Sequence, residues 1–152
     1  MNERMETSAP DVYAGGDVVS FPLNGEIIST GHWQIAQSQG RVAALRALAK
    51  DVALQTVPYF WSGFFGKSLR FAGHVKQPDD VLIDGDVENL KFVAYYFAKG
   101  HVSAVAAYGR DEVPALFASI TKFGHRLTED DVRSDPSAWI NEHRNTGESS
   151  TL

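Results

Sequence analysis

Two apolar runs joined by a predicted two-residue turn constrain the fold of this chain most. Leu90–Phe97 and His101–Tyr108 are rich in aromatic and β-branched side chains, and Lys99-Gly100 lies between them. A two-residue connection of this kind joins antiparallel strands through a tight turn. A further run, Val81-Leu82-Ile83, ends at Asp84-Gly85 and predicts a neighbouring strand. These segments predict a small antiparallel sheet.

Helices are expected after the sheet. One helix is predicted from Asp111, as its cap, to about Gly124, with apolar side chains on one face. A last short helix should start at Asp135-Pro136 and include Trp139 and Ile140. We therefore predict an α+β domain over residues 56–142, with helices on one face of the sheet, and a disordered tail over residues 143–152.

The first part of the chain follows another pattern. Val12-Tyr13-Ala14 reads as a short strand, Phe21–Gly25 as a loop, and about His32 to Lys50 as a helix. Ser29 or Thr30 is the expected helix cap. The predicted inward face of this helix consists mostly of small residues, and Gly40 within it suggests close packing. That face comprises Trp33, Ala36, Gly40, Ala43, Ala44, Ala47 and Leu48.

The segment between the two parts, Val57–Gly66, is unusually aromatic. It holds five aromatic side chains in seven consecutive positions, from Tyr59 to Phe65. So many rings cannot all face water, so we expect them to pack in a core, to line a pocket or to lie under a flat group. For Trp61 alone, a buried core position is as good an interpretation as a ligand contact.

Composition excludes several classes of function. The net charge of −5 and the absence of a basic cluster argue against nucleic acid as the main partner. The chain has no cysteine, which excludes disulfides, thiolate metal sites and a redox dithiol within it. No apolar run approaches the ~20 residues that span a bilayer. The five histidines lack ligand spacing, and Gly66-Lys67-Ser68 is not a P-loop, because Trp61 stands where its first glycine should be. The acids Asp79, Asp80, Asp84 and Asp86 are interpreted as a solvated strand edge.

Asp17, after Gly15-Gly16, is the best candidate for ligand binding. A Gly-Gly-Asp sequence is more often a simple turn. Here, however, a helix follows, and a carboxylate beside backbone N–H groups and a helix N-terminus can bind hydroxyl and phosphate groups. The sequence thus predicts a site at this loop.

Three ordered motifs resemble the C-terminal third of ferredoxin–NAD(P)H reductase-type flavoproteins. They are T-S-A-P-D-V-Y-A-G-G-D-V, H-W-Q-I-A-Q-S-Q-G-R-V-A-A and V-P-Y-F-W-S-G-F-F-G-K-S-L-R-F-A-G. The resemblance is greatest to the apoptosis-inducing-factor-like branch, which carries a Rieske domain. Ser29–His32 replaces the Arg-x-Glu of plain ferredoxin reductases, which also favours that branch. The resemblance implies that residues 1–55 are the last strand–helix piece of a Rossmann-like FAD domain and that residues 56–142 are the reductase C-terminal domain.

The same resemblance implies the site residues. Asp17, with Gly16 and the Val18 amide, would bind the ribityl chain of FAD. His32, Trp33 and Gln34 would face the pyrimidine end of the isoalloxazine ring. Trp61, which belongs to the C-terminal domain, would shield the flavin. No catalytic acid or base and no metal ligand is expected in this chain, because the cofactor carries the chemistry.

The resemblance also implies an electron path from NAD(P)H through flavin to an iron–sulfur acceptor of Rieske or ferredoxin type. The first dinucleotide motif, G-x-G-x-x-G, and the NAD(P)H domain are missing from this sequence. We therefore expect the chain to be part of a flavoenzyme that is inactive alone and binds FAD weakly. The alternative is a truncated, non-catalytic module that docks on a full-length homologue or forms a homodimer. The family suggests a mitochondrial or cytoplasmic location.

Overall fold

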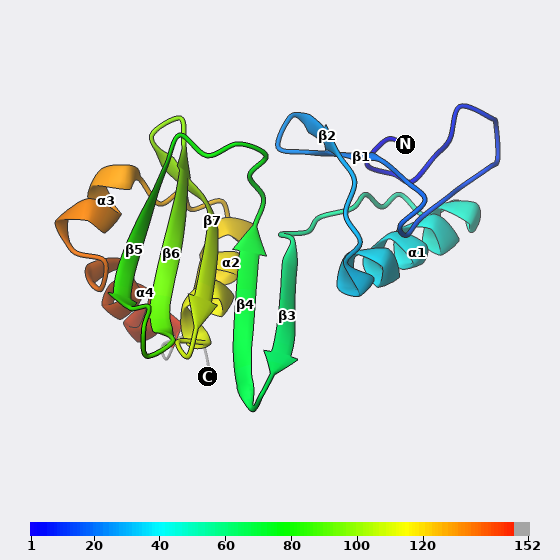
Figure 1. Ribbon diagram of the computed structural model, residues 1–152. Helices are drawn as coiled ribbons and strands as arrows, with labels where there is room; N and C mark the ends of the chain where they lie inside the picture. The colour runs from blue at the N-terminus through cyan, green and yellow to red at the C-terminus, as the bar shows by residue number, and fades with distance from the viewer. Residues whose placement is uncertain (148–152) are drawn as a thin grey trace. The chain divides into compact units, whose positions relative to one another are not determined.

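The computed structural model describes residues 1–147 and the side chains of residues 1–144 (Figure 1). The chain divides into two compact units, Met1–Thr56 and the part from Val57 onward. The first unit contains β1 (Phe21–Leu23), β2 (Glu26–Ile28) and α1 (Trp33–Ala47). The described part of the second unit contains five strands and three helices, so the chain is α+β, as predicted. Within the described residues, no helix is long and apolar enough to cross a membrane.

The first unit has a small apolar core of its own. Met5 and Phe21 are fully buried or nearly so, and Ile35 and Val42 of α1 pack against them. β1 and β2 pair antiparallel around an Asn24-Gly25 turn in which both residues have positive φ. This hairpin occupies the segment that was predicted as a loop. A short edge strand tolerates the proline, and a two-residue turn closes the hairpin. The predicted strand at Val12–Ala14 is reduced to a single bridge between Tyr13 and Glu6.

The predicted inward face of α1 is wrong in most positions. The buried side chains are Ile35, Gln39 and Val42, whereas Trp33 and Leu48 are exposed and Gly40 faces open space. Both faces have helical spacing, but Ile35 and Val42 bury more apolar area than the alanines do. The cap is also not Ser29 or Thr30. His32 is the N-cap residue, and Ser29 Oγ donates instead to the Val19 carbonyl at 3.2 Å.

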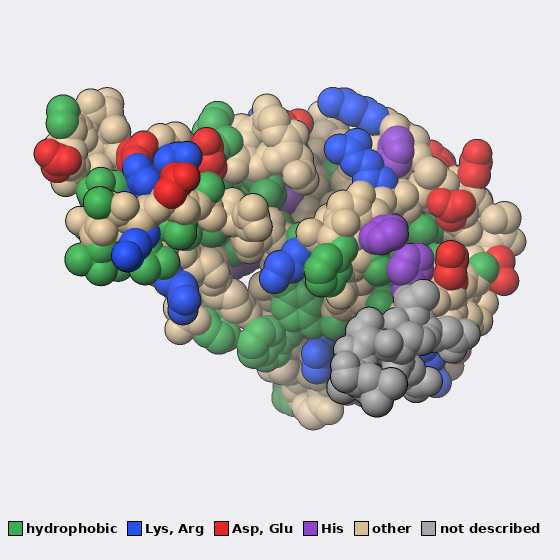
Figure 2. Space-filling view, turned by 180° about the vertical axis from the view of Figure 1, so that it is seen from behind, with side chains coloured by type: hydrophobic (Ala, Val, Ile, Leu, Met, Phe, Trp, Pro, Cys, Tyr) green, Lys and Arg blue, Asp and Glu red, His purple; other side chains and the backbone are tan. Residues whose placement is uncertain are grey.

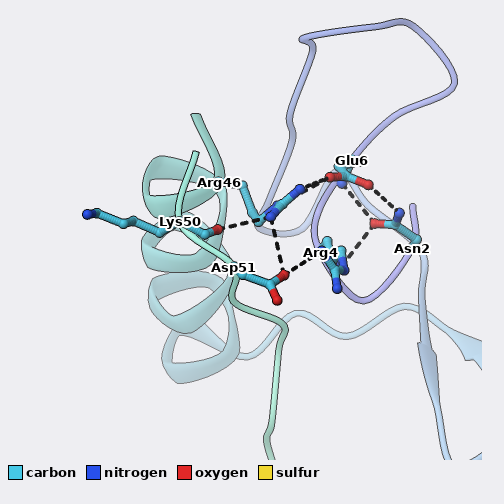
Figure 3. Close-up of polar contacts among 6 residues, drawn as sticks. All are labelled: Asn2, Arg4, Glu6, Arg46, Lys50 and Asp51. Carbon is cyan, nitrogen blue, oxygen red and sulfur yellow. Dashed lines mark hydrogen bonds and ion pairs between the residues drawn. The ribbon is translucent and has the colours of Figure 1, made fainter. Parts of the chain in front are cut away.

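A polar network fixes the N-terminal segment to the end of α1 (Figure 3). Arg46 donates from Nε and Nη2 to Glu6 Oε1 at 3.2 and 2.7 Å. Asn2 Nδ2 donates to Glu6 Oε2 at 2.7 Å, and Arg4 pairs with Asp51 at 2.6 Å. The hydrogen bonds from Asn2 and Arg46 lower the pKa of the Glu6 carboxyl. Residues near Met1 are therefore integrated into the first unit.

The second unit is a five-stranded antiparallel sheet in the order β3-β4-β7-β6-β5. Its strands are β3 (Tyr59–Phe64), β4 (Lys67–Gly73), β5 (Asp80–Asp86), β6 (Lys91–Ala98) and β7 (His101–Tyr108). The predicted turn at Lys99-Gly100 is confirmed, since both residues have positive φ. β3 and β4 were not predicted as strands, because aromatic density hides the alternation along them.

Three helices complete the second unit: α2 (Glu112–Lys122), α3 (Glu129–Ser134) and α4 (Ala138–Gly147). α2 and α4 pass behind the sheet in Figure 1, and the core between these layers includes Tyr95, Phe117 and Trp139. Burial raises the pKa of Tyr95 to about 12, so its phenol stays neutral. The predicted helices on one face are thus confirmed.

Two details of this region differ from the prediction. α3 was not predicted, although Thr128 and Asp131 form a capping box at its start. The predicted disordered tail is wrong for residues 143–147, which belong to α4, and residues 148–152 lie outside the described part.

The helix-free face of the sheet carries an aromatic layer. Phe60 packs on Phe71, with 5.6 Å between ring centroids, and Phe92 stacks on Tyr108 at 6.4 Å. The register places these side chains on the face opposite Tyr95, because alternate residues of a strand point to opposite faces. The aromatic segment Tyr59–Phe65 therefore divides between the two faces and the tip of the β3–β4 hairpin.

Candidate functional site

The Gly15-Gly16 turn lies against the middle of α1. A Cβ built on Gly15 would lie 3.0 Å from Gln39 Cβ and 3.2 Å from the Gly40 nitrogen. The Gly16 amide donates to Gln39 Oε1 at 2.7 Å, and Gly16 has a φ of +91°. Only glycine allows this close approach and this backbone conformation. Gly16 thus serves to shape the loop, and its N–H is already bonded within the chain.

Asp17 and Val18 follow this turn and face outward. The Asp17 side chain is exposed, and among the described residues it accepts no hydrogen bond. A Cβ on Gly31 would lie 4.0 Å from Asp17 Oδ2, so the carboxylate stands beside the segment that enters α1. Val18 is 84% exposed. The loop therefore presents a carboxylate whose acceptor positions are open to hydroxyl groups of a ligand.

The start of α1 offers complementary donors. His32 caps the helix with an extended backbone and without a side-chain cap bond, and no acidic residue stands in the first turn. The first N–H groups and the positive end of the helix dipole therefore favour an acceptor or an anion there. Both polar atoms of the Gln34 amide are buried without a hydrogen-bond partner among the described residues. Unpaired amide atoms of this kind fit a heterocycle that carries both N–H and C=O groups.

Trp61 lies on β3 in the second unit. It is 48% exposed, and its ring centroid lies 6.3 Å from that of Tyr59. Arg70 Nη1 donates to the Tyr59 hydroxyl at 3.3 Å, while Arg70 Nη2 pairs with Asp111 at 2.9 Å. These contacts raise the pKa of the Arg70 guanidinium, and the hydrogen bond to Tyr59 contributes most. The strand that carries Trp61 is thus held by a neighbouring side-chain network.

The other polar clusters have structural partners. Asp80 pairs with Arg133, Asp84 Oδ2 accepts from Arg110 at 2.6 Å, and Asp86 accepts two bonds from Asn89. The predicted solvated acidic edge is thus a set of ion pairs and turn contacts. The arginines that neutralise it lie 26 and 53 residues away in sequence, so no local pattern reveals them.

Two histidines lie together on the second unit. The rings of His125 and His143 meet edge to face with 5.7 Å between centroids, beside a pocket of about 250 Å³. Figure 2 shows histidine side chains, in purple, next to each other on the surface that faces the viewer. His143 Nδ1 lies 2.8 Å from the Trp139 carbonyl oxygen. Among the described residues, no group of three or more His, Asp or Glu side chains is placed to hold a metal ion.

Gln39 is the important residue that sequence analysis missed. It is 1% exposed and holds the glycine turn through its side chain. Its position four residues after Ile35 and three before Val42 was the available signal, because it places a polar side chain on the buried stripe of the helix.

The comparisons with known proteins agree on one family. Residues 59–146 match the family model described as "Reductase C-terminal". "Apoptosis-inducing factor 3" of Mus musculus is 44% identical over 135 residues, which cover 87% of this chain and 22% of that protein. The chain therefore spans about a fifth of the length of this relative.

Solved structures share the fold. The covalent putidaredoxin reductase–putidaredoxin complex contains a chain that matches with a TM-score of 0.74 at 24% identity, over 80% of this chain and 30% of that one. The ferredoxin reductase for the CYP199A2 system of Rhodopseudomonas palustris also matches with a TM-score of 0.74 at 24% identity, over 84% and 32% of the two chains.

Proposed function

Because this chain belongs to the Reductase C-terminal family, we propose that it is the carboxyl-terminal part of an FAD-dependent NAD(P)H oxidoreductase that passes electrons to an iron–sulfur acceptor. The sequence resemblance to the ferredoxin reductase family and its apoptosis-inducing-factor-like branch is confirmed by the family match and the 44% identity. The parent activity, its electron donor and its acceptor are parts of the proposal, as is the role of each site residue.

The observation that carries the proposal is the juxtaposition of Asp17 with the start of α1. The open carboxylate would accept hydrogen bonds from the ribityl hydroxyls, with the Val18 amide beside it. The helix start at His32–Gln34 would face the polar edge of the flavin ring, with the Gln34 amide pairing its N–H and C=O groups. Gly16 would shape the turn rather than donate to the ligand, because its N–H is bonded to Gln39.

Trp61 would act from the second unit. An aromatic ring that is half exposed on a braced strand can cover a flat ring system by stacking. When bound, FAD would supply the redox chemistry, by accepting a hydride from the nicotinamide and passing electrons on singly. This chain's residues bind and orient the cofactor and exclude water from it.

A non-catalytic interaction module is the second candidate function. The exposure of Trp33 (56%), at the start of α1, and of Leu48 (70%), the C-cap residue that follows it, favours this candidate, since exposed apolar side chains can contribute to a contact surface. A full-length homologue or a second copy of the chain would be the partner. This candidate requires a chain that exists without the flavin domain.

Replacement of Asp17 tests the proposed site. In the intact protein, Asp17→Ala should remove charge-assisted hydrogen bonds of about 1.5–3 kcal/mol and weaken FAD binding by about 10- to 150-fold. The flavin content of the purified protein, measured by its absorbance per polypeptide, should fall accordingly. Glu26→Ala, which removes another exposed acid of the first unit, serves as the control and should leave flavin content unchanged. Equal flavin content in the Asp17 variant would contradict the site.

A further inference from the structure

One buried side chain of α1 anchors the glycine turn of the first unit. Gln39 is 1% exposed, and its Oε1 atom accepts the Gly16 N–H at 2.7 Å. Within the part of the chain that the structure describes, it is the only buried residue with a charged or amide side chain. Burial of an amide costs free energy unless the amide is hydrogen-bonded, so the bond to Gly16 is what makes this position tolerable.

Gly16 is also the first residue of the turn that carries Asp17. Gly16 has a φ of +91°, and its carbonyl oxygen accepts the Val19 N–H at 3.1 Å. This bond closes a turn with Asp17 and Val18 at its two central positions. At the far end, Val19 lies in the core of the first unit, and its carbonyl oxygen accepts from Ser29 Oγ at 3.2 Å. Asp17 therefore stands on a turn that is held at both ends.

The two ends of this turn are held by different means. Val19 is held by burial of its apolar side chain. Gly16 has no side chain to bury, so its end of the turn depends on the bond from its N–H to Gln39. The amide oxygen of Gln39 is a neutral acceptor, which fixes the turn without a second negative charge near Asp17.

We propose that Gln39 is a positioning residue for the cofactor: by holding the Gly16 N–H, it fixes the direction in which the Asp17 carboxylate points. This inference rests on the proposed function, since it requires that Asp17 accept hydrogen bonds from the ribityl hydroxyls. Gln39 would not contact FAD, because it is buried beneath the turn. Hydrogen bonds depend on direction as well as distance, so a turn released at Gly16 would bind FAD less tightly.

Removal of the Gln39 acceptor tests the proposal in the intact protein. FAD is stripped from the protein, and its dissociation constant is measured from flavin fluorescence as it is added back. Gln39→Met has a side chain of similar length without an oxygen, and it should weaken FAD binding about three- to tenfold. Gln39→Glu should restore most of the affinity, because burial favours the uncharged carboxyl, whose carbonyl oxygen still accepts the Gly16 N–H. Equal losses in the two variants would overturn the proposal.

A double-mutant cycle separates positioning from a general effect on the fold. If Gln39 acts through Asp17, the variant with both Asp17→Ala and Gln39→Met should bind FAD within about twofold of Asp17→Ala alone. Arg46→Met is the matched control, because it removes hydrogen bonds to Glu6 about two turns further along α1. It should destabilise the first unit and leave FAD binding unchanged. Losses that multiply in the double variant, or a loss in Arg46→Met equal to that in Gln39→Met, would show that Gln39 has only a structural role.

Gly15 provides a second test that leaves every hydrogen-bonding group in place. A Cβ on Gly15 would lie 3.0 Å from Gln39 Cβ and 3.1 Å from the Gln39 carbonyl carbon, so Gly15→Ala should push the turn away from α1 and weaken FAD binding. Gly40→Ala is its control, since nothing lies within 4 Å of a Cβ built there. Equal FAD affinities of these two variants would overturn the proposal.

Failure of this inference can be told apart from failure of the proposed function. If Asp17→Ala weakens FAD binding and Gln39→Met does not, the positioning role alone is wrong. If Asp17→Ala leaves FAD binding unchanged, the proposed flavin site is wrong, and the positioning role falls with it.

Discussion

Gly73→Ala is expected to destabilise the second unit strongly. A Cβ on Gly73 would lie 2.3 Å from the Ser103 carbonyl oxygen and 2.8 Å from Ala104 Cα, both of them backbone atoms of β7. Gly73 also has a φ of +94°, which adds strain for any other residue. The clash and the strain together should cost roughly 3–5 kcal/mol, a large part of the 5–15 kcal/mol that stabilises a typical domain. Hydrogen exchange of the amides of β6 and β7 measures the loss directly.

Gly124→Ala is the control for this experiment. Gly124 has a φ of +85°, but nothing lies within 4 Å of a Cβ built there. It therefore carries the strain without the clash and should lose only about 1–2 kcal/mol. Equal protection of β6 and β7 in the Gly73 and Gly124 variants would contradict the close approach of β4 to β7.

The isolated chain is expected to bind FAD only weakly, with a Kd well above 1 µM. Micromolar affinity requires about 8 kcal/mol, whereas a charge-assisted hydrogen bond at Asp17 contributes about 1.5–3 kcal/mol. The chain has no G-x-G-x-x-G motif to bind the pyrophosphate. Equilibrium dialysis against FAD, together with NAD(P)H oxidation by the same sample, tests this expectation.

A submicromolar Kd for FAD would contradict this expectation, and the Asp17→Ala variant shows where FAD binds. A submicromolar Kd that is lost in Asp17→Ala would mean that the first unit alone supplies a complete flavin site. A submicromolar Kd that is equal in the parent chain and in Asp17→Ala would place FAD elsewhere on the chain.

Much of the second unit could be predicted from sequence. Strands β5, β6 and β7 and helix α2 follow local signals, above all the Lys99-Gly100 turn and the helical spacing after Asp111. β3 and β4 escaped prediction because their rings divide between two faces and a turn, which gives a continuous aromatic run. The turn itself, Phe65-Gly66, lacks the Asn-Gly or Asp-Gly signal that usually marks such a hairpin.

The first unit was harder to predict. Two stripes of α1 have helical spacing, and the choice between them depends on the glycine turn, which packs on Gln39 from 23 residues away. Such a contact is tertiary and leaves no local pattern. The candidate site could be located because Asp17 and the helix start are close in sequence, and the Asp17–Gly31 proximity agrees with that expectation. The role of Gly16 could not be predicted, because it depends on the hydrogen bond to Gln39.

The most direct test of the flavoenzyme proposal is the size and flavin content of the endogenous protein. An antibody to residues 111–128 would be used to isolate it from a native extract. We predict a polypeptide several domains larger than the 16.7 kDa of this chain, with bound FAD whose absorbance is bleached by NAD(P)H. A single flavin-free species near 16.7 kDa would contradict the proposal and favour the interaction module.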